Sequence, residues 1–163
     1  MSRARASDST QREDLLLTPE EILTISFTDR LELPEDAVAY LIDLWNLIQV
    51  LDDAADGDSS DRSAVDRAIW TALAGMPMNA FYERHRAWLV PAMAQATLKW
   101  MASDAAERAG QADARSYMWR AGYYDVVCLV VGLVHGPSSQ RSWDALALYG
   151  ESLAEYMKEF DHA

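Results

Sequence analysis

Apolar residues recur every three or four positions along most of the chain, which is the period of a helix with one buried face. The clearest stretch lies between Pro34 and Gly57, where the recurring apolar residues are Leu41, Leu44, Trp45, Ile48 and Leu51. Acidic residues in the first turn and a glycine just after the last turn are typical of helix ends. The pattern therefore predicts a helix over about residues 34–56 whose apolar stripe lies in the core.

Capping signals predict where the neighbouring helices begin. Thr18, followed by a proline and by Glu21 three positions on, matches a capping box and begins a short helix that ends near residue 26. Asn79 is a suitable N-cap for a long helix that ends near residue 110. Pro91 lies inside this long helix and is expected to kink or divide it, because a proline clashes with the carbonyl four residues earlier. The apolar period predicts the remaining helices over about residues 62–75, 112–135 and 143–160.

The segment 112–135 becomes apolar on nearly every side after Asp125. Its valine-rich run is also compatible with a buried strand, but the sequence contains no second strand pattern with which it would pair. We therefore expect an all-α, single-domain bundle of about six helices, with this apolar fifth helix at its centre. The domain is expected to span residues 14–163, and the polar, locally basic residues 1–13 are expected to form a flexible or partner-ordered arm.

Composition and charge narrow the classes of function. The formal net charge of −12 disfavours binding to nucleic acid or to anionic membranes, since both need Lys and Arg. The longest apolar run, from Val126 to Val134 with one glycine, is shorter than the roughly 20 residues of a membrane span. Cys128 is the single cysteine, so no internal disulfide forms, and no secretory signal is recognisable. We expect a cytoplasmic protein.

Carboxylates gather at the end of the helix predicted over residues 34–56. Asp52 and Asp56 lie one turn apart on one face, and Asp53 lies about 100° round from Asp52. A helix C-terminus carries partial negative charge, so this cluster is destabilising unless a positive group lies among its members. Two interpretations stay open: Asp52 or Asp53 pairs with an arginine such as Arg120, or Asp52, Asp53 and Asp56 are ligands of Mg²⁺.

Four further side chains are predicted to bind a ligand at the same place. Gln49 and Asn46 extend the polar stripe one and two turns back from the aspartates. Arg120 and Tyr124 lie at the polar start of the fifth predicted helix. Arg120 would serve either as the counter-charge of the aspartates or as a clamp for an anionic ligand.

The segment Asp52-Asp53-Ala54-Ala55-Asp56 resembles the DDxxD motif of isoprenoid diphosphate synthases and of phytoene/squalene synthase-like enzymes. In those all-α enzymes such aspartates hold the Mg²⁺ that binds the substrate diphosphate. The resemblance implies a Mg²⁺-dependent, diphosphate-binding enzyme in which Arg120 steadies the diphosphate. Those enzymes carry a second acidic motif on an opposing helix, for which the best substitute here is Asp104 with Glu107. Their chains are also longer, because the prenyl chain needs a deep cavity.

A second resemblance covers more of the chain. Residues 45–58, Asn79-Ala-Phe81 and the segment from Arg120 to Asp125 are similar to stretches of small all-helical proteins of unknown function encoded by tailed bacteriophages. This resemblance implies a non-enzymatic virion component or host-interaction protein, located in the virion or the host cytoplasm, that binds a protein partner or itself. Its acidic pocket would bind a cation or pair with arginine. The Mg²⁺-dependent enzyme is the alternative, so the sequence leaves catalysis open.

Overall fold

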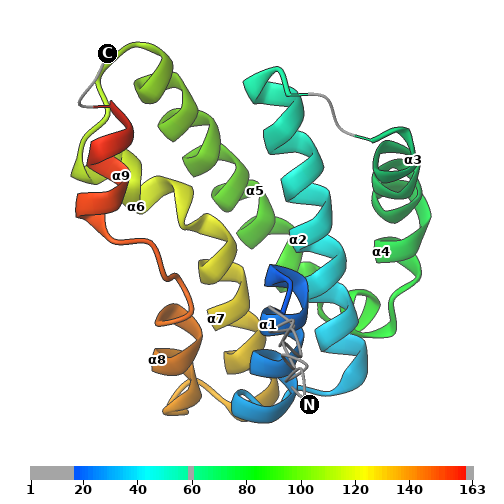
Figure 1. Ribbon diagram of the computed structural model, residues 1–163. Helices are drawn as coiled ribbons and strands as arrows, with labels where there is room; N and C mark the ends of the chain where they lie inside the picture. Colours follow the sequence, from blue (N-terminus) through cyan, green and yellow to red (C-terminus); the bar gives the residue numbers. More distant parts are fainter. Residues whose placement is uncertain (1–16, 59–60, 161–163) are drawn as a thin grey trace, which may run out of the picture.

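The computed structural model describes residues 17–58 and 61–160, and every regular element in that part of the chain is helical (Figure 1). The prediction of an all-α protein is therefore confirmed. The arm predicted for residues 1–13 lies outside the described residues. The α-helices are α1 (Pro19–Ile25), α2 (Glu35–Asp56), α3 (Arg62–Trp70), α4 (Met76–Met78), α5 (Ala80–Arg108), α6 (Ala114–Arg120), α7 (Gly122–His135), α8 (Arg141–Leu146) and α9 (Leu153–Phe160). Two π-helical turns accompany them, η1 (Ser26–Arg30) and η2 (Thr71–Gly75).

The predicted number of about six helices is not confirmed, because several predicted helices are divided. The predicted helix 62–75 is divided into α3 and η2, and the helical chain continues past its predicted end as α4. Pro77 has no N–H to donate to the carbonyl of Leu73, and the preceding turn widens so that Met76 N–H donates to Thr71 O, five residues back. The last predicted helix is divided into α8 and α9 by residues 147–152.

The predicted helix 112–135 is divided into α6 and α7 at Ala121, whose ψ of 9° departs from the helical value. The next residue, Gly122, lies against α5, and a Cβ atom at Gly122 would lie 3.1 Å from the Cα atom of Ala96. A side chain at this position would push α7 away from α5. The break therefore coincides with the closest approach of the two helices.

Pro91, in contrast, does not divide α5, which is continuous from Ala80 to Arg108. Both Pro91 and Ala87 are exposed. The carbonyl of Ala87, which loses its helical hydrogen-bond partner to the proline, therefore lies on the solvent side of the helix, where water can satisfy it.

Helices α2 and α5 run in the same direction and are joined near both ends. Asn79 is the N-cap of α5: its side chain accepts from Tyr82 N–H and its amide donates to the carbonyl of Asp36, both at 2.9 Å. Arg84 forms an ion pair with the Asp36 carboxylate at 2.6 Å. Toward the other end, the Trp100 indole N–H donates to Asp52 Oδ1 at 3.0 Å.

One hydrophobic cluster connects α1, η1, α2, α4, α5, α7 and α8, and it is densest around the first half of α2. Leu41 and Leu44 are buried as predicted, but Ile48 is half-buried and Leu51 is 55% exposed. The predicted core stripe therefore leaves the core in the second half of α2. In the described part of the chain, no helix combines the length and the hydropathy needed to cross a membrane.

The predicted position of the fifth helix at the centre of the bundle is not confirmed. One face of α7 is buried, including Val126, Val127, Val130 and Val131. Leu129 and its neighbours on the other side remain partly exposed, so α7 is packed along one face and not on every side.

Replacing Asn79 by alanine is expected to lower the free energy of unfolding by about 2 kcal/mol, because both the cap and the tether to α2 are lost. The Tm should fall by about 4–8 °C in thermal unfolding. Asn79→Ser retains a capping oxygen but no amide donor, so it should lose roughly half as much. Equal stability of Asn79→Ala and the unchanged protein would contradict this role.

Candidate functional site

A cavity of about 390 Å³ lies between the second half of α2 and α5. Residues of η2 and α4 complete one wall, and residues around the junction of α6 and α7 complete the other. Its volume is within the range of ligand-binding pockets, about 300–1,000 Å³. Most lining side chains are apolar, and the larger ones are Leu44, Leu47, Ile48, Leu51, Met76 and Met93. Three aromatic residues, Tyr82, Trp100 and Tyr123, also line it.

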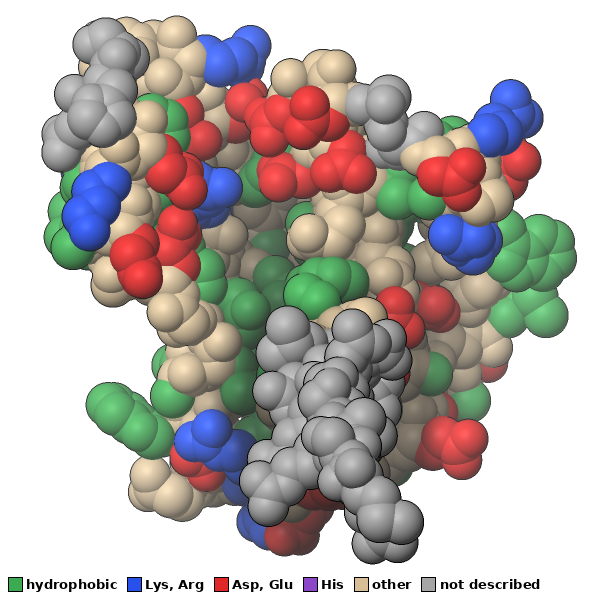
Figure 2. All heavy atoms as spheres, viewed as in Figure 1, with side chains coloured by type: hydrophobic (Ala, Val, Ile, Leu, Met, Phe, Trp, Pro, Cys, Tyr) green, Lys and Arg blue, Asp and Glu red, His purple; other side chains and the backbone are tan. Residues whose placement is uncertain are grey.

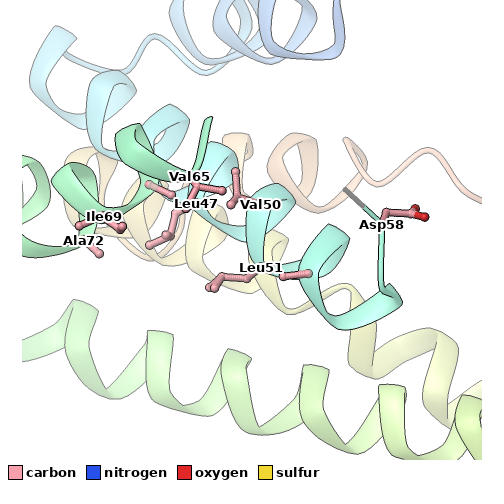
Figure 3. Close-up of a pocket in the computed structure, with 9 residues that line it drawn as sticks. Leu47, Val50, Leu51, Asp58, Val65, Ile69 and Ala72 are labelled. Atoms are coloured by element: carbon pink, nitrogen blue, oxygen red, sulfur yellow. The ribbon is translucent and has the colours of Figure 1, made fainter. Parts of the chain in front are cut away.

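A second cavity, of about 470 Å³, separates α2 from α3 (Figure 3). Val65 of α3 lies close to Leu47 and Val50 of α2, whereas Asp58 stands apart at one end. Leu47 and Leu51 line both cavities, as does Ala72 of η2. The second half of α2 is therefore underpacked on two sides.

Negative charge gathers at one end of the cavity between α2 and α5. Asp52 accepts from the indole of Trp100, which lines the cavity. The C-terminal end of α2, which carries the partial negative charge of its helix dipole, follows Asp52 by about one turn. Figure 2 shows acidic side chains crowded over the C-terminal end of α2. On α5, Asp104 pairs with Arg108 at 2.7 Å.

The pKa of the Asp56 carboxyl is raised at this crowded end of α2. Partial desolvation raises the pKa of Asp56, and the carboxylates of Asp52, Asp58 and Asp104 raise it further, while Arg120 opposes them. The acidic residues of α2 thus lie within electrostatic reach of an acidic residue of α5, the helix on which the sequence offered a second acidic pair.

Arg120 lines the cavity, but its charge is already balanced by glutamates. Its guanidinium lies 3.6 Å from Glu107 and 3.7 Å from Glu159, and 5.3 Å from the centre of the Tyr156 ring. Partial burial disfavours the charged form, yet Glu107, Glu151 and Glu159 together raise the pKa of Arg120. The site therefore presents no uncompensated positive charge from this residue.

A hydrogen-bonded network fixes Glu107 beside Arg120. The Tyr156 hydroxyl donates to Glu107 Oε1 at 2.8 Å and lies 2.6 Å from Ser116 Oγ. Ser103, which is buried, lies 2.9 Å from the same glutamate oxygen. These contacts join α5, α6 and α9 and hold the carboxylate in one position.

The structure brings together only some of the residues predicted to bind a ligand. Arg120 lines the cavity, whereas Asn46, Gln49 and Tyr124 do not. Gln49 is exposed on α2. Tyr124 instead packs edge-on against Tyr123, with ring centres 5.3 Å apart, and against Tyr149 at the same distance.

The predicted Mg²⁺ ligands Asp52, Asp53 and Asp56 all lie in the last two turns of α2. Within residues 17–58 and 61–160, no three His, Cys, Asp or Glu side chains are grouped so that they could hold a metal ion. The Mg²⁺ site stays a prediction from the sequence.

Sequence reasoning missed two residues of this site, Trp100 and Tyr156. Trp100 had the apolar spacing of a core residue, and only its N–H, a donor that needs a partner when half-buried, hinted at a polar contact. Tyr156 likewise belonged to an apolar stripe in the sequence.

Comparisons with models of protein families, with curated proteins and with solved structures find no match to this chain. The function of the protein is therefore inferred from the geometry of the site.

Asp56→Asn is expected to stabilise the protein, because it removes a carboxylate from a crowded negative helix end. A raised pKa means that the folded state holds the proton more strongly than the unfolded state, so ionisation of Asp56 costs stability above its pKa. The Tm of Asp56→Asn should exceed that of the unchanged protein by about 1–3 °C near pH 7. The gain should shrink as the pH falls through the raised pKa of Asp56, because the carboxyl is then neutral in the folded state.

Asp29→Asn is the matched control for this measurement, because Asp29 is an exposed aspartate of η1. It should leave the Tm nearly unchanged at both pH values. A lower Tm for Asp56→Asn than for the unchanged protein at neutral pH would show that Asp56 stabilises the fold.

Proposed function

We propose that this protein binds an apolar small molecule in the cavity between α2 and α5 and does not transform it. The observation that carries the proposal is the cavity of about 390 Å³ with its aliphatic and aromatic lining. Pockets of this size with a few polar groups are the usual form of small-molecule sites.

Energetics support an occupant. An empty apolar cavity costs about 24 cal/mol per Å³, so a closed cavity of about 390 Å³ would cost about 9 kcal/mol. That figure is an upper bound, because the cavity is partly open to solvent. Filling the cavity with an apolar molecule recovers part of this free energy.

The polar groups of the lining support binding without catalysis. The Thr97 hydroxyl donates to the carbonyl of Met93 at 2.8 Å, and the Tyr123 hydroxyl donates to the carbonyl of Leu41 at 2.9 Å. The Trp100 N–H donates to Asp52. These three donors already form hydrogen bonds within the protein, so they are not free to donate to a ligand.

The proposal predicts saturable binding of N-phenylnaphthylamine, a neutral apolar dye whose fluorescence rises in apolar surroundings. One molecule should bind per chain. Ile48→Trp places a larger side chain in the cavity and should weaken dye binding by about tenfold or more. Ile25→Trp, an exposed position of α1, is the matched control and should bind the dye as the unchanged protein does.

Absence of saturable binding, or equal binding by Ile48→Trp, would overturn the proposal. The Mg²⁺-dependent alternative is tested in the same preparation with Mg²⁺ and pyrophosphate. A rise of the Tm with both present, abolished by Asp53→Asn, would favour that enzyme over a simple binding protein.

A protein-interaction role is a second candidate, because large apolar side chains stand out from the α3–α4 region. The exposed fractions are 67% for Trp70 and 77% for Leu73, and Ile69 and Met78 are also exposed. Figure 2 shows apolar side chains projecting at the edge of the molecule where α3 lies. Tryptophan is among the residues that dominate the binding energy of protein interfaces, and neighbouring exposed apolar side chains mark interaction sites. Self-association is the simplest form of this role.

If a second copy of the chain covers this face, the unchanged protein should dimerise with rising concentration in sedimentation velocity. Leu73→Ser should then weaken the dimer by about tenfold, since an anchoring apolar side chain is lost. Leu17→Ser, exposed before α1, should not. A protein that stays monomeric at every concentration would exclude self-association as its role.

A further inference from the structure

The cavity between α2 and α5 ends among carboxylates, and this arrangement constrains its ligand. Asp52 contacts Trp100, which lines the cavity, and Glu107 contacts Arg120, which also lines it. Asp56 follows Asp52 by one turn of α2 and lies within electrostatic reach of both Asp52 and Arg120. A molecule that fills the apolar part and reaches Trp100 therefore places its end near the Asp52 carboxylate.

The positive charges at this end are already engaged. Arg108 pairs with Asp104 at 2.7 Å. Arg120 lies near two glutamates, at 3.6 and 3.7 Å, and against the ring of Tyr156. An anionic ligand at this end would be repelled by Asp52, by Asp56 and by the negative end of α2, whereas a cation would be attracted to them.

Aromatic residues give an independent indication of the same charge. Trp100, Tyr82 and Tyr123 all line the cavity. Because Asp52 occupies the indole N–H of Trp100, a ligand meets the ring of this residue and not its hydrogen-bond donor. Aromatic faces attract ammonium groups, and tryptophan does so most strongly.

We propose that the ligand of this cavity is an organic cation, with an apolar body between α2 and α5 and an ammonium group at the end formed by Trp100, Asp52 and Asp56. The inference rests on the proposed binding function and adds the charge of the ligand. The apolar wall of α2 from Leu44 to Leu51 rises by about 10 Å, which suits an alkyl chain of moderate length.

The experiment compares three probes with the same chain, namely octylammonium, octanol and octanoate, by isothermal titration calorimetry. Octylammonium should bind about tenfold tighter than octanol, and octanoate should bind most weakly. Added salt should narrow the difference between octylammonium and octanol, because it screens the partly exposed carboxylates.

Two variants assign the preference to this end of the cavity. Asp56→Asn should weaken octylammonium binding severalfold and leave octanol binding unchanged. Asp52→Asn should act in the same way, since asparagine retains an oxygen that accepts from the Trp100 N–H. Asp29→Asn, remote in the sequence and outside the cavity lining, should leave all three affinities unchanged.

The outcomes separate this inference from the proposed function. Equal binding of octanol and octylammonium would overturn the cationic ligand and leave the apolar binding site standing. Tightest binding of octanoate would also overturn it, and would identify Arg120 as the group that selects the ligand. If none of the three probes binds, or if Ile48→Trp binds them all unchanged, both proposals fail.

Discussion

The pairing of α2 with α5 is the constraint on which the rest of the structure depends. Asn79 ties the start of α5 to the first turn of α2, and Trp100 ties the two helices again near Asp52. Between these two attachments the packing changes: the core ends at Leu44, and the helices enclose a cavity beyond it. The two helices are joined at separated points, and between these points α5 presents the small side chain of Ala96 to the cavity. The side chains of the two helices therefore leave a space unfilled.

The end of α2 carries an electrostatic cost. The C-terminal end of α2 carries partial negative charge, and lysine or arginine would stabilise such an end. The chain instead places Asp52 and Asp56 there, and desolvation together with the neighbouring carboxylates raises the pKa of Asp56. A stability cost at one place, next to an apolar cavity, is the pattern expected where binding has been favoured over stability.

Sequence reasoning succeeded where the determinants are local. The capping box at Thr18, the N-cap at Asn79 and the left-handed Gly57 after α2 all depend on a few neighbouring residues, and all are found. Sequence reasoning failed where segments distant in the sequence determine whether a residue packs in the core or lines a cavity. Ile48 and Leu51 have the same spacing whether they pack in a core or line a cavity, and the difference lies in what α5 places opposite them. Likewise, Asp52 and Arg120 were recognisable, but the indole that binds Asp52 lies 48 residues away.

The walls of the cavity differ in how firmly they are held. The α5 and α7 walls belong to the core, and Gly122 packs against Ala96 with no space for a side chain. In contrast, neither α3 nor η2 contributes a single buried residue, and Ala72 of η2 faces cavities on both sides of α2. Local opening costs least where few apolar contacts are buried. Local opening is therefore expected to cost least at the wall formed by η2, and more at Trp100, whose N–H is bonded to Asp52.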